Sequence, residues 1–462
     1  MKNLALLFVF LASSAFAQNR SAFDKPNVII ILTDDQGYAD VGFNGSTEIP
    51  TPGIDRIAKN GVVFTSGYVS YAVCGPSRAG LLTGRYQDKF GFSKNPLLAP
   101  KDPLMGLPLS EETMGDVMKK AGYTTAVIGK WHMGAHPTLR PNERGFDEFY
   151  GFLSGGHDYF PENLVLEDID QAKTQYDGYK TKLLRNTERV EETEYLTDAF
   201  SREAIDFVQR NHKAPFFMYL AYNAPHAPMQ ATEKYLSRFP NIKDNKRKTY
   251  AAMVSAVDDG VDALLNKLEE LGIDDNTLVF FLSDNGGPTS ANASDNSPLR
   301  GFKGDFFEGG IRVPFAMQWK GVVPSGKSYD HPVISLDIFS TAVALAEVAP
   351  KNELDGVNLI PFLTGENSGL PHQELYWRNY AANRFAIRIA DSKQISDSEN
   401  IYLFDIQKDI SESVNLYSTQ TERVSRLNHL VEKWKKSIMD PVFMGLLEDK
   451  EYSKLHPDRF NK

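Results

Sequence analysis

Four apolar runs of strand length recur along the chain, and each of them ends in polar or charged residues. The first run, Val28 to Leu32, is continuously β-branched or aliphatic, which is typical of a strand buried on both faces of a parallel sheet. Stretches with helical patterning precede the other three runs, at 114–121, 195–211 and 250–271. Alternating helices and apolar strands predict an α/β fold with a mainly parallel central sheet.

The polar residues that follow these runs are the most informative set in the sequence. Because the carboxyl ends of parallel strands meet at one edge of a sheet, where ligands bind in such folds, we expect these side chains to converge. Asp and Asn are common in any turn that follows a strand. Turn preference does not explain why polar residues after all four runs have charges that suit a metal and an anion. The residues are Asp34 and Asp35, Lys130 and His132, His226, and Asp284 and Asn285.

Carboxylate and amide oxygens of this kind suit a hard cation such as Ca²⁺ or Mg²⁺. A divalent cation beside Lys and Arg side chains forms a site for a tetrahedral oxyanion. The sequence therefore predicts a metal-assisted anion site at the carboxyl edge of the sheet.

The single cysteine of the chain, Cys74, begins the stretch CGPSRAGLLTG. Pro76 suits the first turn of a helix, so Cys74 is predicted at a helix N-terminus, where backbone N–H groups favour negative charge. Arg78 lies one turn further in. One interpretation is a small buried residue at the start of a core helix, and another is a thiolate nucleophile with a histidine partner. The second fits poorly, because a Cys–His pair has no need of a carboxylate-bound cation.

Residues 1–17 have the pattern of a secretory signal, with one lysine, an apolar run and small residues before the expected cleavage site. No later segment reaches the ~18 consecutive apolar residues of a membrane span. We therefore expect an exported bacterial protein, periplasmic or secreted, without a membrane partner. The formal net charge of −10 makes a nucleic-acid partner unexpected.

These motifs together resemble the formylglycine-dependent sulfatases of the alkaline phosphatase superfamily. The first signature of that family, with the core Cys-x-Pro-Ser-Arg, is matched by AVCGPSRAGLLTG, and the second resembles GYTTAVIGKWH. The likeness continues in the family's order through TDDQGY, TPGIDRIAKNGVVFTSGYV, APHAP, SDNGG and GFKGDFFEGGIRVPF. It implies a catalytic domain over 23–365 with a mixed, mainly parallel sheet flanked by helices. It also implies a small α+β subdomain over 366–462, with an antiparallel sheet and a helix.

The resemblance implies that Cys74 is not the working form of that residue. In this family a maturation enzyme oxidises the cysteine to formylglycine, an aldehyde that is hydrated to a geminal diol. One oxygen of the diol attacks sulfur and expels the substrate alcohol. Deprotonation of the second hydroxyl then re-forms the aldehyde and releases sulfate, so that one hard displacement becomes two easier steps.

The resemblance also implies the metal ligands and the group that holds sulfate. The metal would be Ca²⁺, the usual ion of the family, or Mg²⁺. Together with the cation, Lys303 would hold the sulfate oxygens and offset their charge in the transition state. The implied ligands are Asp34, Asp35, Asp284, Asn285 and the modified Cys74.

The other catalytic roles follow from the same motif matches. Arg78 and Lys130 would polarise and orient the diol. His132 would accept a proton during the elimination, and His226 would protonate the oxygen of the leaving alcohol.

A sulfated saccharide is the implied substrate, since the chain is similar to bacterial sulfatases that act on marine galactans such as carrageenan or on glycosaminoglycans. His157, in SGGHDYF with Ser154 and Asp158, is expected to contact the sugar, and the alternative is a structural histidine whose hydrogen bonds are satisfied within the fold. A basic lip for further sulfate groups is expected from Arg300, Arg140 and Arg144.

Two alternatives come from other functional classes. The first is a phosphodiesterase or phosphonate hydrolase of the same superfamily, although the Cys-x-Pro-Ser-Arg core argues against it. The second is a non-catalytic carbohydrate-binding protein, which would apply if Cys74 were never converted. Relative rates on matched aryl sulfate and phosphate esters would separate the first alternative from a sulfatase.

Overall fold

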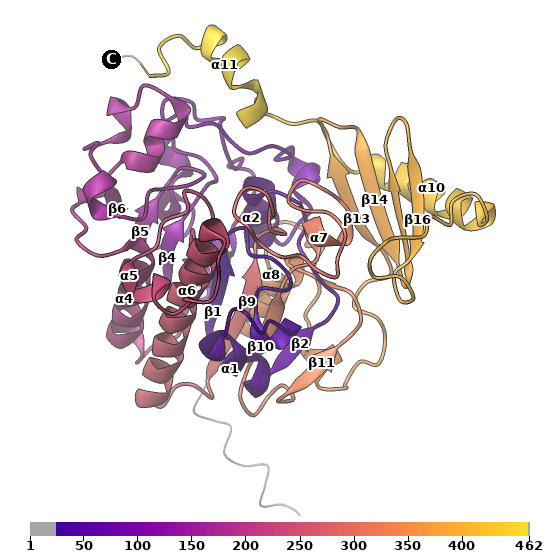
Figure 1. Ribbon diagram of the computed structural model, residues 1–462, viewed down its shortest axis with the longest axis horizontal. Coiled ribbons are helices and arrows are strands. Elements are labelled where there is room, and N and C mark those ends of the chain that lie inside the picture. The colour runs from indigo at the N-terminus through magenta and orange to yellow at the C-terminus, as the bar shows by residue number, and fades with distance from the viewer. Residues whose placement is uncertain (1–24, 461–462) are drawn as a thin grey trace, which may run out of the picture.

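A ten-stranded mixed sheet forms the centre of the larger domain in this computed structural model, which describes residues 25–460 (Figure 1). The expected signal segment, 1–17, lies outside the described residues. Five neighbouring strands are parallel, in the order β9 (Thr277–Ser283), β1 (Asn27–Thr33), β8 (Phe216–Ala221), β4 (Thr124–Lys130) and β5 (Glu148–Phe152). Beyond β9 lie β10 (Phe315–Gln318), β2 (Val62–Phe64) and β11 (Lys327–Tyr329); beyond β5 lie β6 (Leu183–Arg185) and β7 (Glu188–Val190).

Helices cover both faces of this sheet, and β1 is buried at every position, as its continuous apolar run predicts. Ile29 and Ile31 pack in the same core as α1 (Pro52–Asn60), α4 (Leu196–Asn211) and α6 (Asn245–Glu270). Val28, Ile30 and Leu32 pack toward α2 (Cys74–Thr83), α3 (Met114–Lys120) and α8 (Leu336–Ala346). The alternation of side chains along one strand therefore divides the interior into two cores.

A separate antiparallel sheet forms the smaller C-terminal part, seen beside α7 in Figure 1. Its strands follow one another in chain order: β13 (Leu375–Asn379), β14 (Arg384–Ile389), β15 (Ser392–Ser396) and β16 (Ile401–Asp405). The helix α10 (Thr421–Lys435) contacts β14. The chain then returns to the large domain, where Lys94 pairs with Glu448 and Arg459 donates to the Leu98 carbonyl oxygen.

The remaining elements are short. The other helices are α5 (Glu233–Leu236), α7 (Glu308–Ile311), α9 (Ile360–Leu363) and α11 (Asp449–Leu455), and a two-stranded sheet joins β3 (Gly67–Tyr68) to β12 (Val333–Ile334). The 3-10 turns are η1 (Gly42–Asn44), η2 (Gln87–Phe90), η3 (Pro137–Leu139), η4 (Pro141–Glu143), η5 (Pro161–Asn163), η6 (Ile169–Gln171), η7 (Gln175–Lys180) and η8 (Leu446–Glu448).

The fold class expected from the sequence is confirmed, with one difference at a helix boundary. The helix expected over 250–271 begins at Asn245 instead. Its first turn is entirely polar and carries no apolar periodicity, and the Asp244 carboxylate caps it by accepting from the Arg247 backbone N–H at 2.7 Å.

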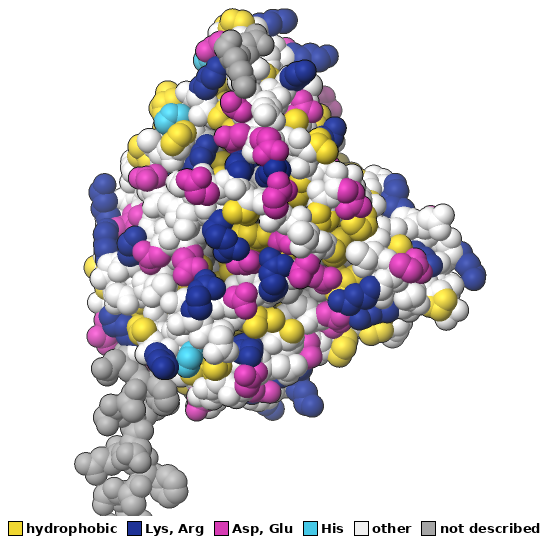
Figure 2. Space-filling model, turned by 90° about the vertical axis from the view of Figure 1, so that its left-hand side faces the viewer, with side chains coloured by type: hydrophobic (Ala, Val, Ile, Leu, Met, Phe, Trp, Pro, Cys, Tyr) yellow, Lys and Arg dark blue, Asp and Glu magenta, His cyan; other side chains and the backbone are white. Residues whose placement is uncertain are grey.

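The surface carries both signs of charge. Figure 2 shows basic and acidic side chains interspersed over one face. Within residues 25–460, no helix is both long and apolar enough to cross a bilayer.

Candidate active site

Three carboxylates and the cysteine converge at the carboxyl edge of the parallel strands. Asp34 and Asp35 follow β1, Asp284 follows the neighbouring strand β9, and Cys74 is the first residue of α2. One oxygen of each carboxylate and Cys74 Sγ all lie within 4.8 Å of one another, and all four residues are buried. Segments far apart in the chain therefore build one compact cluster.

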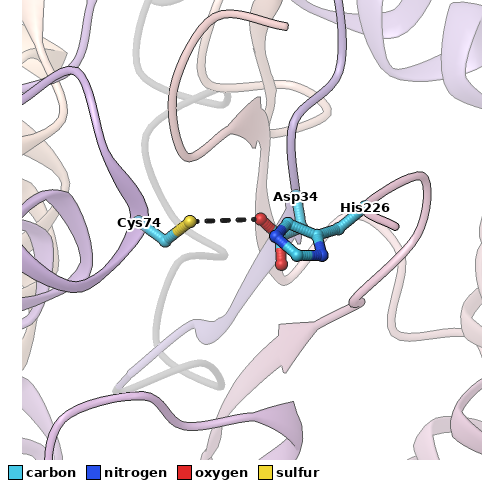
Figure 3. Close-up of side chains that lie close together, drawn as sticks. All are labelled: Asp34, Cys74 and His226. Atoms are coloured by element: carbon cyan, nitrogen blue, oxygen red, sulfur yellow. Dashed lines mark hydrogen bonds between the residues drawn. The ribbon is translucent and has the colours of Figure 1, made fainter. Parts of the chain in front are cut away.

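Cys74 lies between a carboxylate and an ammonium group. Its thiol donates to Asp34 Oδ1 at 3.5 Å, and Lys303 Nζ donates to its Sγ at 3.1 Å. Figure 3 shows Cys74 directed toward Asp34, with His226 on the far side of that carboxylate. Burial raises the pKa of the thiol to about 12, although Lys130 and Lys303 oppose that rise. The unmodified thiol is therefore protonated at neutral pH, which argues against the thiolate-nucleophile interpretation.

Each carboxylate of the cluster has a cationic partner. Two of these cations, Arg78 and Lys130, are completely buried, a burial that ionised groups tolerate only when they are paired. The closest contacts are Lys130 Nζ to Asp34 Oδ2 at 2.5 Å, Lys303 Nζ to Asp35 Oδ1 at 2.6 Å and Arg78 Nη2 to Asp284 Oδ2 at 2.8 Å.

Because of these pairings, the carboxyl groups of Asp35 and Asp284 differ in pKa. Burial raises the pKa of Asp35, but Lys303 and His226 outweigh it and bring that pKa down to about 2. Burial and the neighbouring Asp34 raise the pKa of Asp284 to about 6, against the effect of Arg78. The crowding of negative charge around Asp284 is the kind of environment that a bound cation relieves.

The hydrogen bonds of Asn285 show whether the oxygen atoms of this cluster suit a bound cation. Its Nδ2 donates to Asp35 Oδ1 at 2.7 Å and to the Gly286 carbonyl oxygen at 3.0 Å. Its Oδ1 is buried without a hydrogen-bond partner, a costly state for an amide oxygen unless a ligand completes it. A bare amide oxygen beside three carboxylates fits a hard cation such as Ca²⁺ or Mg²⁺.

Two histidines border the cluster. His226 Nδ1 lies 2.6 Å from the Ala227 carbonyl oxygen and therefore carries the proton, while Nε2 lies 3.6 Å from Asp35 Oδ2. Burial, opposed by Asp35, lowers the pKa of His226 to about 3. His132 has a positive φ of 58° and a buried Nδ1 without a partner, and burial with Lys130 lowers its pKa well below the usual value. Both imidazoles are neutral at pH 7.

His157 lies outside this cluster. It is completely buried, with Nδ1 3.0 Å from the Asp158 carbonyl oxygen and Nε2 2.9 Å from that of Thr181. Burial lowers its pKa to about 4. A neutral ring donates to only one of these two oxygens, and complete burial leaves His157 no exposed nitrogen for the sugar contact expected from the sequence. Ser154 is engaged as well, donating to the Gly156 carbonyl oxygen at 2.7 Å.

The arginines of the expected basic lip are also engaged elsewhere. Arg300 donates to the Glu412 carbonyl oxygen at 2.8 Å, and its guanidinium lies 4.0 Å from the centre of the Phe307 ring. Arg144 is buried and donates to the Leu107 carbonyl oxygen at 2.7 Å. Arg140 Nε donates to the Ala135 carbonyl oxygen at 3.2 Å. These contacts hold loops together, and Arg144 is buried by them, whereas Arg300 is exposed and Arg140 half-buried, so a basic lip at these two residues stays a prediction.

Asn292 also supports the cluster, although the sequence did not predict this role. Asn292 is completely buried, and its Nδ2 donates to the Asp35 backbone oxygen at 3.0 Å and to that of Pro225 at 3.4 Å. It thereby braces Asp35, whose φ of 66° is unusual for a non-glycine residue, against the loop that carries His226. Asn292 lies in a polar stretch without periodicity, so no local signal marks it.

Two family models match most of the chain. A family model described as Sulfatase matches residues 26–348, and one described as N-sulphoglucosamine sulphohydrolase, C-terminal, matches residues 303–439. The N-acetylgalactosamine-6-sulfatase of Mus musculus is 35% identical over 353 residues, which cover 73% of this chain and 66% of that protein. The match thus spans slightly less than two thirds of that relative's length.

Two solved structures extend the likeness to nearly the whole chain. The crystal structure of Ps i-CgsB in complex with k-i-k-neocarrahexaose is 41% identical, has a TM-score of 0.86, and covers 95% of this chain and 100% of that one. The PsFucS1 sulfatase from Pseudoalteromonas sp. is 26% identical with a TM-score of 0.72, covering 94% of this chain and 90% of that one.

Proposed function

The chain belongs to the sulfatase family of sulfuric ester hydrolases, and on that premise we propose that it removes sulfate from a sulfated polysaccharide or its oligosaccharides. The resemblance drawn from the sequence motifs is thereby confirmed at the level of the family. For the substrate we favour a galactan of the carrageenan type, with glycosaminoglycans as the alternative. The support is the 41% identity to a protein crystallised with neocarrahexaose, against 35% to an N-acetylgalactosamine-6-sulfatase.

The position of Cys74 carries this proposal. Its Sγ lies 3.1 Å from the Lys303 ammonium group and within 4.8 Å of oxygens from three carboxylates. A reactive oxygen at this position would have a cation site and an ammonium group close to it. That arrangement suits attack on an anionic ester, because positive charge surrounds the group that gains negative charge.

The groups that this site would hold have distinct tasks. A formylglycine made from Cys74 would supply the nucleophilic oxygen, and a Ca²⁺ or Mg²⁺ ion would offset the charge of the sulfate oxygens. The ion would be held by Asp34, Asp35, Asp284, Asn285 and the modified Cys74.

The chain's own side chains supply the remaining functions. Lys303 binds a sulfate oxygen, and Arg78 with Lys130 fixes the carboxylates and orients the group at position 74. His132 is neutral and accepts a proton when sulfate is released. His226 gives a proton to the leaving alcohol oxygen, and the negative charge of a bound sulfate favours the protonated imidazole that this step requires.

The proposal extends to maturation and compartment. We propose that a formylglycine-generating enzyme converts Cys74, and that the protein is exported to the periplasm or secreted, where sulfated saccharides are encountered. The catalytic domain would span 23–365 and the smaller subdomain 366–462.

Desulfation of defined sulfated oligosaccharides by protein co-produced with a maturation enzyme tests the function, with mass spectrometry following the loss of sulfate. Carrageenan and glycosaminoglycan fragments form the panel, and matched aryl sulfate and aryl phosphate esters test the reaction type. We expect turnover of a sulfated saccharide, preference for the aryl sulfate, and no activity in Cys74→Ala. An active Cys74→Ala variant or a preference for the phosphate ester would refute the proposal.

A further inference from the structure

The segment from Thr174 to Thr181, here called the strap, is fastened to the loop that carries His157. Ser154 Oγ donates to the Gly178 carbonyl oxygen at 3.2 Å, and the Asp158 backbone N–H donates to the Tyr179 carbonyl oxygen at 2.9 Å. His157 Nε2 lies 2.9 Å from the Thr181 carbonyl oxygen. Residues of the motif SGGHDYF, which the sequence predicted to contact the sugar directly, thus hydrogen-bond to the strap.

The opposite end of the strap is closed internally by an aspartate and is held to other segments by a glutamine. The Thr174 backbone N–H donates to the Asp177 carboxylate at 2.9 Å, and Gln175 Oε1 accepts from the Leu98 backbone N–H at 2.8 Å. Arg459, from the C-terminal segment, also donates to Gln175. With both ends fastened, the side chains of the strap keep one position relative to the carboxyl edge of the sheet.

Tyr179 of the strap lies close to the candidate catalytic groups. A methyl group on Gly156 would lie 2.7 Å from the Tyr179 hydroxyl oxygen, and one on Gly155 would lie 2.7 Å from His132 Nε2. The phenol and the imidazole therefore pack against neighbouring positions of one loop, Gly156 and Gly155. Burial raises the pKa of the Tyr179 phenol, Cys74 and Asp34 add to that rise, and Lys303 opposes it.

The phenol has no evident structural task. Among residues 25–460 no hydrogen bond of the Tyr179 hydroxyl is seen, although the side chain is only partly exposed. The ring of Tyr176, on the same strap, lies edge-to-face at 5.9 Å between centroids and is 63% exposed. A large exposed aromatic ring on a fixed segment, next to a partly buried phenol, is typical of a ligand contact.

We propose that Tyr179 and Tyr176 form a saccharide subsite beside the sulfate-binding centre, an inference that rests on the proposed function. The Tyr179 hydroxyl hydrogen-bonds the sugar that carries the sulfate ester, and the Tyr176 ring packs against the apolar C–H face of an adjoining sugar. Because the strap is fastened before substrate arrives, little conformational freedom is lost on binding. His157 and Ser154 are positioning residues that act through the strap.

Steady-state kinetics of Tyr179→Phe and Tyr176→Ala tests this subsite. The probes are 4-nitrophenyl sulfate and the best-hydrolysed oligosaccharide of the panel, with neocarrahexaose tried first. Tyr179→Phe removes only the hydroxyl, so the fold is retained. The matched controls are Tyr417→Phe and Tyr417→Ala, at a 41% exposed tyrosine of the smaller subdomain.

We expect Tyr179→Phe to raise the KM for the oligosaccharide about fivefold to tenfold, the effect of one lost hydrogen bond, and Tyr176→Ala to raise it about as much. The kcat/KM of Tyr179→Phe and Tyr176→Ala on 4-nitrophenyl sulfate should stay within about twofold of the parent. Both Tyr417 variants should stay within about twofold of the parent on both substrates.

An unchanged oligosaccharide KM in Tyr179→Phe and Tyr176→Ala would overturn the subsite, as would equal losses of kcat on both substrates. Parent protein that hydrolyses neither probe would contradict the proposed function instead. Turnover of the aryl sulfate alone would contradict the saccharide assignment and the subsite with it.

Discussion

At the scale of single residues, the side-chain amide of Asn285 marks the cation site most clearly. Its nitrogen is committed to Asp35 and Gly286, while its oxygen is buried and unpaired. The same arrangement places Asp34 and Asp284 close to Asp35, so their negative charges repel unless cations balance them. A metal ion would satisfy the amide oxygen and the carboxylates together.

Removing the Asn285 oxygen should therefore weaken metal binding. We expect Asn285→Ala to raise the Kd for Ca²⁺ at least about tenfold, measured by isothermal titration of chelator-treated protein. The measurement requires no conversion of Cys74, so it is independent of enzymatic activity. Asn266→Ala, on the outer face of α6, should bind Ca²⁺ like the parent. Equal affinities for the parent and Asn285→Ala would remove Asn285 from the ligand set.

His226 offers a second residue-scale prediction, through the leaving group. A sugar alkoxide needs a proton to depart, whereas nitrophenolate is stable without one. We expect His226→Ala to lower kcat on a sulfated oligosaccharide about 100-fold or more, and on 4-nitrophenyl sulfate less than about tenfold. His429→Ala, on the exposed side of α10, serves as the control. Equal losses on the two substrates would contradict the role of His226 as an acid.

At the scale of elements, two paired glycines determine how β4 and β5 present the residues that follow them. Gly129 faces Gly151 across the strand pair and Ala221 on the other side. A Cβ atom on Gly129 would lie 1.9 Å from the Ala221 carbonyl oxygen, and its φ of 110° is left-handed. The backbones of β4, β5 and β8 therefore approach closely at Gly129, one residue before Lys130.

Gly129→Ala should consequently destabilise the fold strongly. We expect a loss in the free energy of unfolding of at least about 3 kcal/mol, from backbone strain and overlap together. Gly122→Ala is the matched control, because Gly122 also has a positive φ, of 86°, but open space around it, so about 1–2 kcal/mol is expected there. Urea denaturation measures both losses, and similar values would show that the backbone contact at Gly129 is unimportant.

At the scale of the whole molecule, a buried ionic cluster joins the smaller sheet to the loop that carries Lys303. Lys393 Nζ of β15 lies 2.7 Å from Glu308 Oε1 and 2.9 Å from Glu412 Oε1, and all three side chains are fully buried. Burial raises the pKa of Glu308, but Lys393 and two nearby arginines outweigh it and bring that pKa down to about 2. Since Glu308 begins α7, five residues after Lys303, the smaller sheet braces the active-site loop.

Removing Lys393 would leave two carboxylates buried without their shared partner. We expect Lys393→Met to lower the free energy of unfolding by about 3–5 kcal/mol. Arg384→Met is the comparison, because Arg384 is 30% exposed and lies 3.2 Å from Asp397 and 3.6 Å from Asp305, so about 1 kcal/mol or less is expected. Chemical denaturation measures both variants, and equal effects would show that the buried cluster adds nothing.

Much of the fold and of the central cluster could be predicted from the sequence, because local patterns encode them. A continuous apolar run makes a buried strand, and the residues that follow parallel strands meet at one edge. Asp34, Lys130 and Asp284 follow directly from that rule. Cys74 follows from the start of its helix, since a proline two residues later suits the first turn.

Tertiary structure alone decided which polar side chains remain available to a ligand. His157 is as polar as the cluster residues, yet it is completely buried and the Thr181 carbonyl oxygen lies 2.9 Å from its Nε2. Tyr179 carries no motif, and it packs against Gly156 only because the strap is fastened across the loop that carries that glycine. Chain-local periodicity specifies where an element begins and ends, whereas the hydrogen-bond partner of a buried group depends on segments that meet only after the elements have packed.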